Sequence, residues 1–192
     1  MRRALALAGL MLFLAACLTA QKDRFYTLNA PESPTAPASG AASGYTVAVG
    51  PVTVPEIVDR PQIVVGVAPN EVTLYEQHRW AAPLQSDIAR VIVANLAQQL
   101  GTARVWSAPA AARPTADYQV LVDVRRFDSM PGEAVVVDAL CLIRSAAGSD
   151  AKLGRSLVRE PTSASGIDAL VAAHSRALTR VSQDIATALR GS

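Results

Sequence analysis

Cysteine and histidine are both scarce in this chain, with two of each among 192 residues. Neither His78 nor His174 belongs to an HExxH metal motif, and the sequence has no GxSxG nucleophile elbow. A catalytic site needs a nucleophile, a base and a group that orients them, and these residues offer few combinations of the three. We therefore expect no catalytic residue, no metal site and no cofactor, and predict that the protein is not an enzyme.

The sequence also lacks a surplus of charge of one sign. It has 18 Lys and Arg against 16 Asp and Glu, and two of the basic residues, Arg2 and Arg3, lie in a segment that we expect to be cleaved. The pI of about 8.7 therefore describes the whole sequence, whereas the remaining 16 basic and 16 acidic side chains balance. No basic surface is left to bind a phosphate backbone, so nucleic acid is not an expected partner.

The N-terminus has the layout of a secretory signal. Arg2 and Arg3 precede an apolar run of 13 residues, from Ala4 to Ala16, and small residues stand before Cys17. As a helix this run is too short to cross a bilayer core of roughly 30 Å. The segment from Leu14 to Cys17 resembles the bacterial lipobox; the alternative is an ordinary signal peptide with a cysteine near its cleavage site.

The lipobox resemblance implies cleavage between Ala16 and Cys17, and acylation of Cys17 on both its thiol and its new amino group. Three acyl chains exceed the two signals that stable membrane attachment requires. Leu18 and Thr19 follow the cysteine, whereas lipoproteins retained in the inner membrane of Gram-negative bacteria carry aspartate there. We therefore expect a lipid-anchored protein on the periplasmic face of the outer membrane. Cys141 would then be the one free thiol, which excludes an intramolecular disulfide.

Three parts are expected along the chain. Residues 1–16 are the cleaved signal peptide, residues 17–24 are the lipidated cysteine with a short tether, and residues 25–192 are a single periplasmic domain. Residues 29–44 are rich in Pro, Ser, Ala and Gly without a hydrophobic period, which predicts a flexible loop in that domain. Aromatic residues make up only 5% of the chain, so the core should consist of small aliphatic side chains.

Strands are predicted where apolar residues alternate with small or polar ones. They are expected at residues 25–28, 45–54, 62–67, 71–76, 102–106, 118–125, 135–143 and 152–160. Pro51 indicates a bulge or an edge position in the second of these segments. Turn residues at 68–70 and 129–132 predict two hairpins. Cys141 shares one face of a valine-rich strand, so we expect it to be buried and unreactive.

Two helices are predicted at residues 83–100 and 166–189, because apolar residues recur there at spacings of three and four. Pro83 and Gly101 suit the two ends of the first helix, and Ser165 with Asp168 suggests a cap for the second. His174 lies on or beside the apolar stripe of the second helix, which favours a packed histidine. The elements together predict an α+β fold: a mixed, mostly antiparallel sheet with two long amphipathic helices packed on one face.

The order of these segments resembles a known family. The similar blocks are residues 25–28, 47–65, 79–101, 117–128 and 167–186. Together they are similar to the PqiC family, the ABC-type transport auxiliary lipoproteins associated with MCE lipid transport systems, over nearly the whole mature chain. One strand departs from the pattern, since residues 139–142 read Ala-Leu-Cys-Leu where an aromatic such as tryptophan is expected.

The resemblance implies a non-catalytic subunit that docks a periplasm-spanning MCE protein at the outer membrane, on a route that carries lipids between the two membranes. An MCE protein is therefore the expected partner, and the symmetry of MCE assemblies suggests a homo-oligomer as well. A lipid-binding carrier or chaperone is the alternative, and it requires an apolar cavity between the sheet and the helices. An enzyme acting on envelope lipid or peptidoglycan is a third class, for which no catalytic set can be assembled.

Two charged segments supply the candidate partner-binding residues. These candidates are Arg79, Trp80, Glu56, Asp59 and Arg60. Arg and Trp are enriched at interface hot spots, and Arg79 and Trp80 are expected in a loop with His78, just before the first helix. Trp80 as a lid on the core is an equal alternative. For Glu56, Asp59 and Arg60, which lie between two prolines, an exposed turn without a partner is the alternative.

Overall fold

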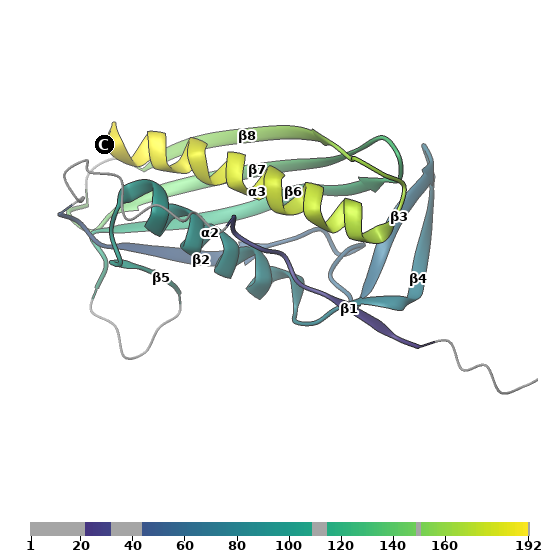
Figure 1. Ribbon diagram of the computed structural model, residues 1–192. Helices are drawn as coiled ribbons and strands as arrows, with labels where there is room; N and C mark the ends of the chain where they lie inside the picture. Colours follow the sequence, from purple (N-terminus) through teal and green to yellow (C-terminus); the bar gives the residue numbers. More distant parts are fainter. Residues whose placement is uncertain (1–21, 32–43, 109–114, 149–150, 192) are drawn as a thin grey trace, which may run out of the picture.

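The computed structural model describes residues 22–31, 44–108, 115–148 and 151–191. The expected signal peptide, Cys17, the tether up to residue 21 and most of the 29–44 loop lie outside these residues. The described chain folds into two sheets and two helices, which confirms the α+β class (Figure 1).

The larger sheet has five strands in the order β5-β2-β6-β7-β8. Its strands are β2 (Val47–Thr53), β5 (Val105–Ser107), β6 (Tyr118–Met130), β7 (Ala134–Ser145) and β8 (Lys152–Pro161). The short β2 pairs in parallel with both of its neighbours, whereas β6, β7 and β8 are antiparallel. The pairing of β2 with β6 shifts register between Val49 and Val52, so the irregularity that Pro51 predicted is present.

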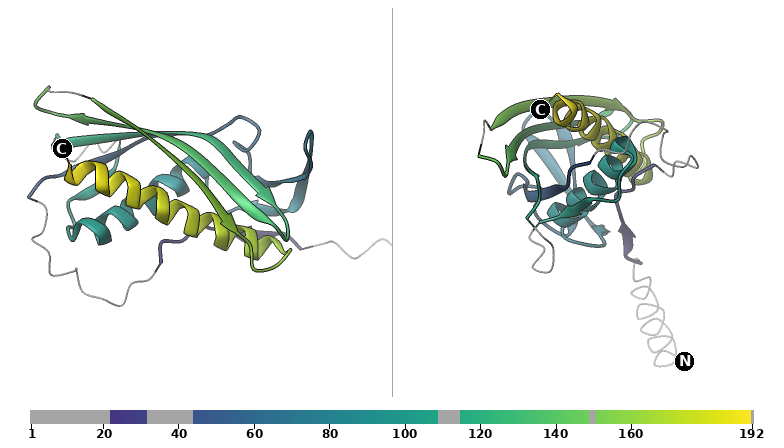
Figure 2. Two further views of the ribbon diagram at one scale, coloured as in Figure 1. Left: turned by 90° about the horizontal axis from the view of Figure 1, so that it is seen from above. Right: turned by 90° about the vertical axis from the view of Figure 1, so that its left-hand side faces the viewer.

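The smaller sheet has three strands in the order β1-β4-β3. It consists of β1 (Arg24–Tyr26), β3 (Gln62–Ala68) and β4 (Glu71–Trp80). The expected hairpin is formed by β3 and β4, and β1 pairs in parallel with the last three residues of β4. This sheet lies at the end of the domain opposite the C-terminus (Figures 1 and 2).

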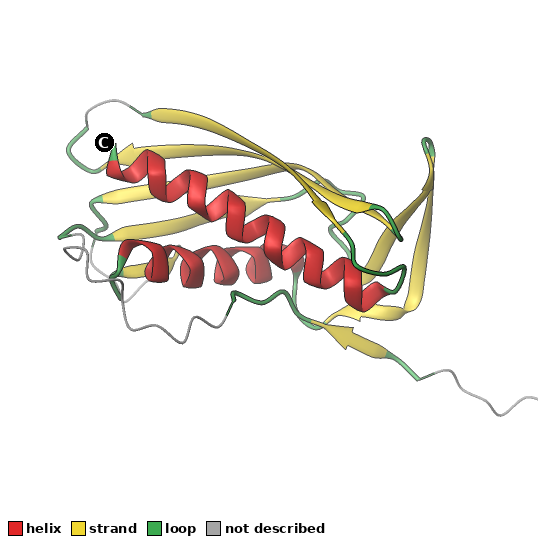
Figure 3. Ribbon diagram, turned by 45° about the horizontal axis from the view of Figure 1, so that its top comes forward, coloured by secondary structure: helices red, strands yellow, loops and turns green. Residues whose placement is uncertain are grey.

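The helices α2 (Leu84–Leu100) and α3 (Ile167–Arg190) lie side by side across one face of the larger sheet (Figure 3). Gly101 ends α2 in the left-handed conformation, with φ of 63°, and its N–H donates to the carbonyl oxygen of Gln98. Neither helix in the described part of the chain combines the length and apolar character needed to cross a membrane.

The expected cap of α3 is wrong. Gly166 occupies the N-cap position, and no side chain caps the helix there. Asp168 instead forms an ion pair with Arg24 of β1, with 3.2 Å between the two charged groups. The first turn of α3 is therefore tied to the N-terminal strand.

The core follows the alternation expected for β6 and β7, with one change of phase. Val122 and Val124 are buried, the next two residues, Arg125 and Arg126, are both exposed, and Phe127 is buried again. The cause is a register shift in the β6–β7 ladder between Val124 and Arg126. Such a bulge places two consecutive side chains on the solvent side and returns the strand to the core one residue later.

Candidate partner-binding site

The fold brings the two candidate segments together at the base of the β3–β4 hairpin. Asp59 and Arg60 lie in the loop that enters β3, and Arg79 lies near the end of β4, opposite Gln62. The backbone N–H of Trp80 donates to the carbonyl oxygen of Pro61 at 2.7 Å. Residues about twenty positions apart in sequence therefore form one local surface.

The expected loop before α2 is wrong, because His78, Arg79 and Trp80 are the last residues of β4. They pair in parallel with Arg24, Phe25 and Tyr26 of β1. The hydroxyl of Tyr26 and Nδ1 of His78 are hydrogen-bonded at 2.7 Å, and the two rings are stacked. Burial raises the pKa of Tyr26, with a further contribution from the nearby charge of Asp168. Pairing with β1 thus extends β4 beyond residues 71–76, where the sequence alone predicts a strand.

Trp80 is a core residue, and only 7% of it is exposed. Its ring packs edge-on against Phe127, with 6.3 Å between the ring centroids. Phe127 in turn stacks on His174 of α3, with 3.8 Å between the ring centroids. The three rings connect the smaller sheet, the larger sheet and α3, so the candidate assignment of Trp80 to a partner surface is corrected to the lid on the core.

His174 lies in the core beside Phe127. It is 1% exposed, and its Nε2 is hydrogen-bonded to the hydroxyl of Ser129 at 2.8 Å. Burial lowers the pKa of His174 to about 3, so the imidazole is neutral at physiological pH. The other scarce residue, Cys141, is also buried, and burial raises the pKa of its thiol to about 12. Both side chains are inert core residues, as the sequence predicted.

The remaining candidates lie at or near the surface. Glu56 and Asp59 are exposed, and Asp59 accepts a hydrogen bond from Nε2 of Gln85 at 2.9 Å. Nε of the half-buried Arg79 donates to the carbonyl oxygen of Glu76 at 2.8 Å. Nε of Arg60 is buried and has no hydrogen-bond partner among the described residues. Four charged side chains thus surround the hairpin base, and their role in binding stays a prediction.

A groove of about 620 Å³ adjoins this surface, between the hairpin and the β6–β7 turn. Apolar side chains supply much of its lining, among them Ile57, Val67, Val72 and Met130. The sequence predicted the hairpin but not the groove, because alternation alone does not show that valines of β3 and β4 stay uncovered.

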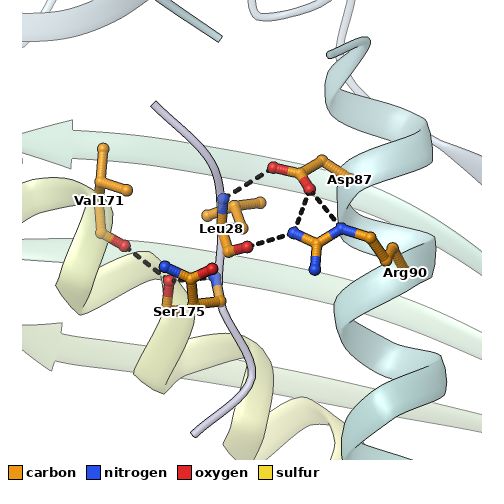
Figure 4. Close-up of polar contacts among 6 residues, drawn as sticks. Leu28, Asp87, Arg90, Val171 and Ser175 are labelled. Atoms are coloured by element: carbon orange, nitrogen blue, oxygen red, sulfur yellow. Dashed lines mark hydrogen bonds and ion pairs between the residues drawn. The ribbon is translucent and has the colours of Figure 1, made fainter. Parts of the chain in front are cut away.

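A second feature that the sequence did not predict is a clasp between the N-terminal segment and the helices (Figure 4). Leu28 is fully buried, and its N–H donates to a carboxylate oxygen of Asp87 at 2.7 Å. Arg90 donates to the carbonyl oxygen of Leu28 and to Asp87, so one residue has both backbone groups held by α2. Ser175 of α3 accepts from the N–H of Asn29 at 3.1 Å. The N-terminal segment that contains Leu28 and Asn29 is therefore fastened to both helices.

The described residues contain no group of three or more His, Cys, Asp or Glu side chains that could hold a metal ion. Two of the carboxylates have pKa values below the usual range. Hydrogen bonds from Thr46 lower the pKa of Asp117, and a hydrogen bond from Arg155 lowers the pKa of Asp138. Both carboxylates stabilise contacts of the strands.

Comparisons with known proteins identify relatives of this fold. The fold is similar to a crystal structure of an uncharacterized protein, with a TM-score of 0.72 at 20% identity over 88% of this chain and 99% of that chain. It is also similar to protein XCC0632 from Xanthomonas campestris, with a TM-score of 0.65 at 22% identity over 84% and 92% of the two chains. At these identities the likeness concerns the fold alone. No match was found among curated proteins.

Family membership follows from the sequence. Residues 26–186 match the family described as the ABC-type transport auxiliary lipoprotein component. The matched range begins at the last residue of β1 and ends in the last turns of α3, so it includes all the other strands, the whole of α2 and most of α3. The chain therefore belongs to the ABC-type transport auxiliary lipoprotein family.

Proposed function

We propose that this protein is a non-catalytic docking subunit of an MCE-type lipid transport system, anchored to the outer membrane through acyl chains on Cys17. The observation that carries the proposal is the family match over residues 26–186, together with the lipobox and the residues Leu18 and Thr19 after it. The buried positions of His174 and Cys141 also support a role without catalysis.

The base of the β3–β4 hairpin is the proposed contact with the MCE protein. Glu56, Asp59, Arg60 and Arg79 surround it, and they present charge of both signs to a partner. The side of the adjacent groove that the β6–β7 turn forms, with Met130 and Pro131, offers apolar area, and interfaces commonly combine an apolar centre with a polar rim.

Binding of the full-length, lipidated protein in detergent to the MCE protein tests this contact. The double variant Asp59→Lys with Arg60→Glu should reduce the amount of MCE protein recovered. Asp123→Lys is the matched control, because Asp123 is also exposed but lies on β6, where it accepts a hydrogen bond from Thr53. Equal recovery with wild type and the double variant would remove the hairpin base from the interface, and no recovery with wild type would reject the docking function.

Cys17→Ala tests the anchor separately. Cys17 precedes the first described residue by only five positions, so loss of its acyl chains removes the membrane attachment without touching the domain. We expect a folded periplasmic protein that fails to restore function to a strain lacking it. Full complementation by a variant that is free in the periplasm would contradict the proposal.

A lipid carrier is the second candidate, favoured by a groove of about 440 Å³ between β8 and the C-terminal half of α3. Ile143 and Ile185 contribute apolar lining, whereas Lys152 and Arg155 add positive charge suited to a lipid phosphate. Gly154 lies in this groove, and a Cβ atom there would meet only ordinary contact distances. Gly154→Phe should therefore place a ring in the groove, and loss of co-purified phospholipid in native mass spectrometry would support the carrier.

Self-association into a homo-oligomer is a further part of the proposal. The mass of the lipidated protein in detergent, measured by light scattering, tests it directly. A strict monomer at all concentrations would contradict it.

A further inference from the structure

Exposed apolar side chains gather at the hairpin end of the domain. Seven large hydrophobic residues are exposed among those described, and two of them, Leu153 and Leu157, lie on β8. The other five lie on β1, β3, β4 or the loop before β3. They are Phe25, which is 63% exposed, Ile57 at 48%, Val67 at 54%, Val72 at 48% and Leu74 at 36%. Such a concentration at one end of a domain marks an interaction surface.

The hairpin tip, defined as residues 66–74, extends beyond the part of the domain that the helices cover (Figure 1). Glu71 is the one charged residue between Gln62 and Tyr75. A two-stranded hairpin in water usually carries charged or polar side chains on its exposed strands. Here the exposed positions include Val67, Val72 and Leu74 instead. These apolar side chains are open to water in the described part of the chain.

The chain that leads to the membrane anchor leaves from this same end. β1 runs parallel to the end of β4, and the described residues begin at Lys22, just before β1 (Figure 2). Three contacts fix the exit of the chain: the Arg24–Asp168 ion pair, the Tyr26–His78 hydrogen bond and the Leu28 clasp. The tether therefore starts from a fixed point and not from a loose terminus.

Chain length then limits how far the membrane can be from this end. Four residues separate Cys17 from Lys22, and a fully extended segment of this length reaches about 17 Å. β4 alone has ten residues, so the hairpin is about twice as long as this reach. The base of the hairpin, where β1 pairs with residues 78–80, must accordingly lie close to the bilayer surface whenever Cys17 is acylated, and the tip reaches the same surface when the hairpin lies along it.

We propose that the tip of the β3–β4 hairpin, together with Phe25, rests in the lipid interface of the membrane that holds the anchor. The proposal depends on the acylation of Cys17 proposed above. At the tip, β3 and β4 pair only with each other, so the tip rests at the hydrated level of the headgroups, where water satisfies the outer backbone groups, and only its apolar side chains enter the lipid. Glu71 can remain at the level of the headgroups because it follows the turn at the tip. The contact would hold the domain in one orientation and leave the charged hairpin base free beside the bilayer.

Spin labels on the full-length, lipidated protein in vesicles of phosphatidylethanolamine and phosphatidylglycerol test this contact. The labels are placed on Val67→Cys and Val72→Cys, and Leu153→Cys is the matched control. Leu153 is 70% exposed and also apolar, but it lies next to Lys152, which contacts Gly191 at the opposite end of the domain. Cys141 is buried and Cys17 is blocked by its acyl chains, so neither competes for the label.

The ratio of oxygen accessibility to nickel-chelate accessibility should be several-fold higher at positions 67 and 72 than at position 153. Flotation of the vesicles reports the anchor independently. Protein that floats but has equal ratios at the three positions would overturn the hairpin contact and leave the anchor intact. Protein that does not float would overturn both. Shielding of positions 67 and 72 that arises only after the MCE protein is added would also overturn the proposal, because the tip would then be a protein-binding surface.

Discussion

At the scale of single residues, the alternation of β4 separates two neighbours that the sequence grouped together. Trp80 is buried against Phe127, whereas Arg79 is half-buried and contacts the backbone of Glu76. Successive side chains of a strand point to opposite faces, so an Arg-Trp pair in a strand cannot present both groups to one partner. The two residues should consequently respond differently to truncation.

Trp80→Ala should lower the free energy of unfolding by about 3–5 kcal/mol, because it leaves a cavity beside Phe127. Arg79→Ala should change it by less than about 0.5 kcal/mol, since the side chain makes one exposed hydrogen bond. Urea denaturation of both variants measures the difference. Similar losses for the two would show that Trp80 is not the core residue described here.

His174 should make the protein sensitive to acid. Its pKa is lowered from 6.5 to about 3 in the folded state, so below pH 6.5 the unfolded chain binds a proton that the folded protein excludes. The free energy of unfolding should therefore fall as the pH drops from 6.5 toward 4, by roughly 1 kcal/mol per pH unit. Denaturation curves at several pH values in this range measure the slope.

The double variant His174→Phe with Ser129→Ala is the control for this effect. It keeps an aromatic ring against Phe127 and removes both partners of the buried hydrogen bond. In this variant the free energy of unfolding should depend only weakly on pH above pH 4. Asp117 and Asp138 interfere little above about pH 5, because the loss of stabilisation that follows from their lowered pKa values lies below that pH. An unchanged slope would assign the acid sensitivity to another group.

At the scale of elements, the fold was predictable wherever the signal is local. The periodicity of α2 and α3 and the alternation of β6, β7 and β8 depend on neighbouring residues, and the ends of these elements were found within one or two residues, except that β6 continues five residues beyond its predicted end. Residues 77–80 of β4 were missed; the last three of them pair with β1, more than fifty residues away, and Arg79 also pairs with Gln62 of β3. The phase change at Arg125 was missed for a similar reason, since a bulge is a property of the pairing with β7.

The Leu28 clasp was equally hard to predict from the sequence. An aspartate in the first turn of α2 looks like an ordinary helix-end charge. Only the packed structure shows that Asp87 is 3% exposed and receives the N–H of a residue from outside the helix. Long-range contacts of this kind leave no periodic trace in a single sequence.

Leu28→Ala should detach the N-terminal segment from the helices. The side chain is fully buried, so its truncation should cost about 2–5 kcal/mol of local stability. Hydrogen exchange at the amides of residues 24–29 measures the opening, which should increase while exchange in β6 and β7 stays slow. Ser175→Ala is the milder control, because the N–H of Asn29 that it leaves is exposed to water. Unchanged exchange at the Tyr26 amide in Leu28→Ala would show that β1 pairing alone fastens the segment.

At the scale of the whole molecule, β1 and the clasp connect the N-terminal segment to both helices, and in the proposed arrangement the short tether extends this connection to the membrane. Arg24 and Leu28 are held to α3 and α2, and the hairpin stands at the same end (Figure 3). In the proposed arrangement the hairpin end faces the bilayer and the C-terminus of α3 points into the periplasm. The charged hairpin base would then meet a partner next to the membrane, where a lipid conduit has to end.

A longer tether tests whether attachment of the protein to the membrane is sufficient for function, or whether the position of the domain at the bilayer also matters. A flexible insertion of 20 Gly and Ser residues after Ala20 adds a mean end-to-end distance of about 25 Å to a native reach of about 17 Å. The acyl chains and the domain are unchanged, but the effective concentration of the hairpin end at the bilayer falls. We expect the variant to float with vesicles, to lose part of the lipid contact at position 67, and to restore resistance to detergent only partly in a strain that lacks the protein.

The same insertion after Gly148, in the turn between β7 and β8, is the matched control. That turn lies at the end marked by the contact between Lys152 and Gly191, away from the tether, so the insertion changes chain length without moving the domain from the membrane. If position is part of the function, the two insertions must differ, because both preserve the fold and the anchor. Full activity of the lengthened tether would mean that attachment to the membrane suffices and that the fixed exit of β1 serves stability alone.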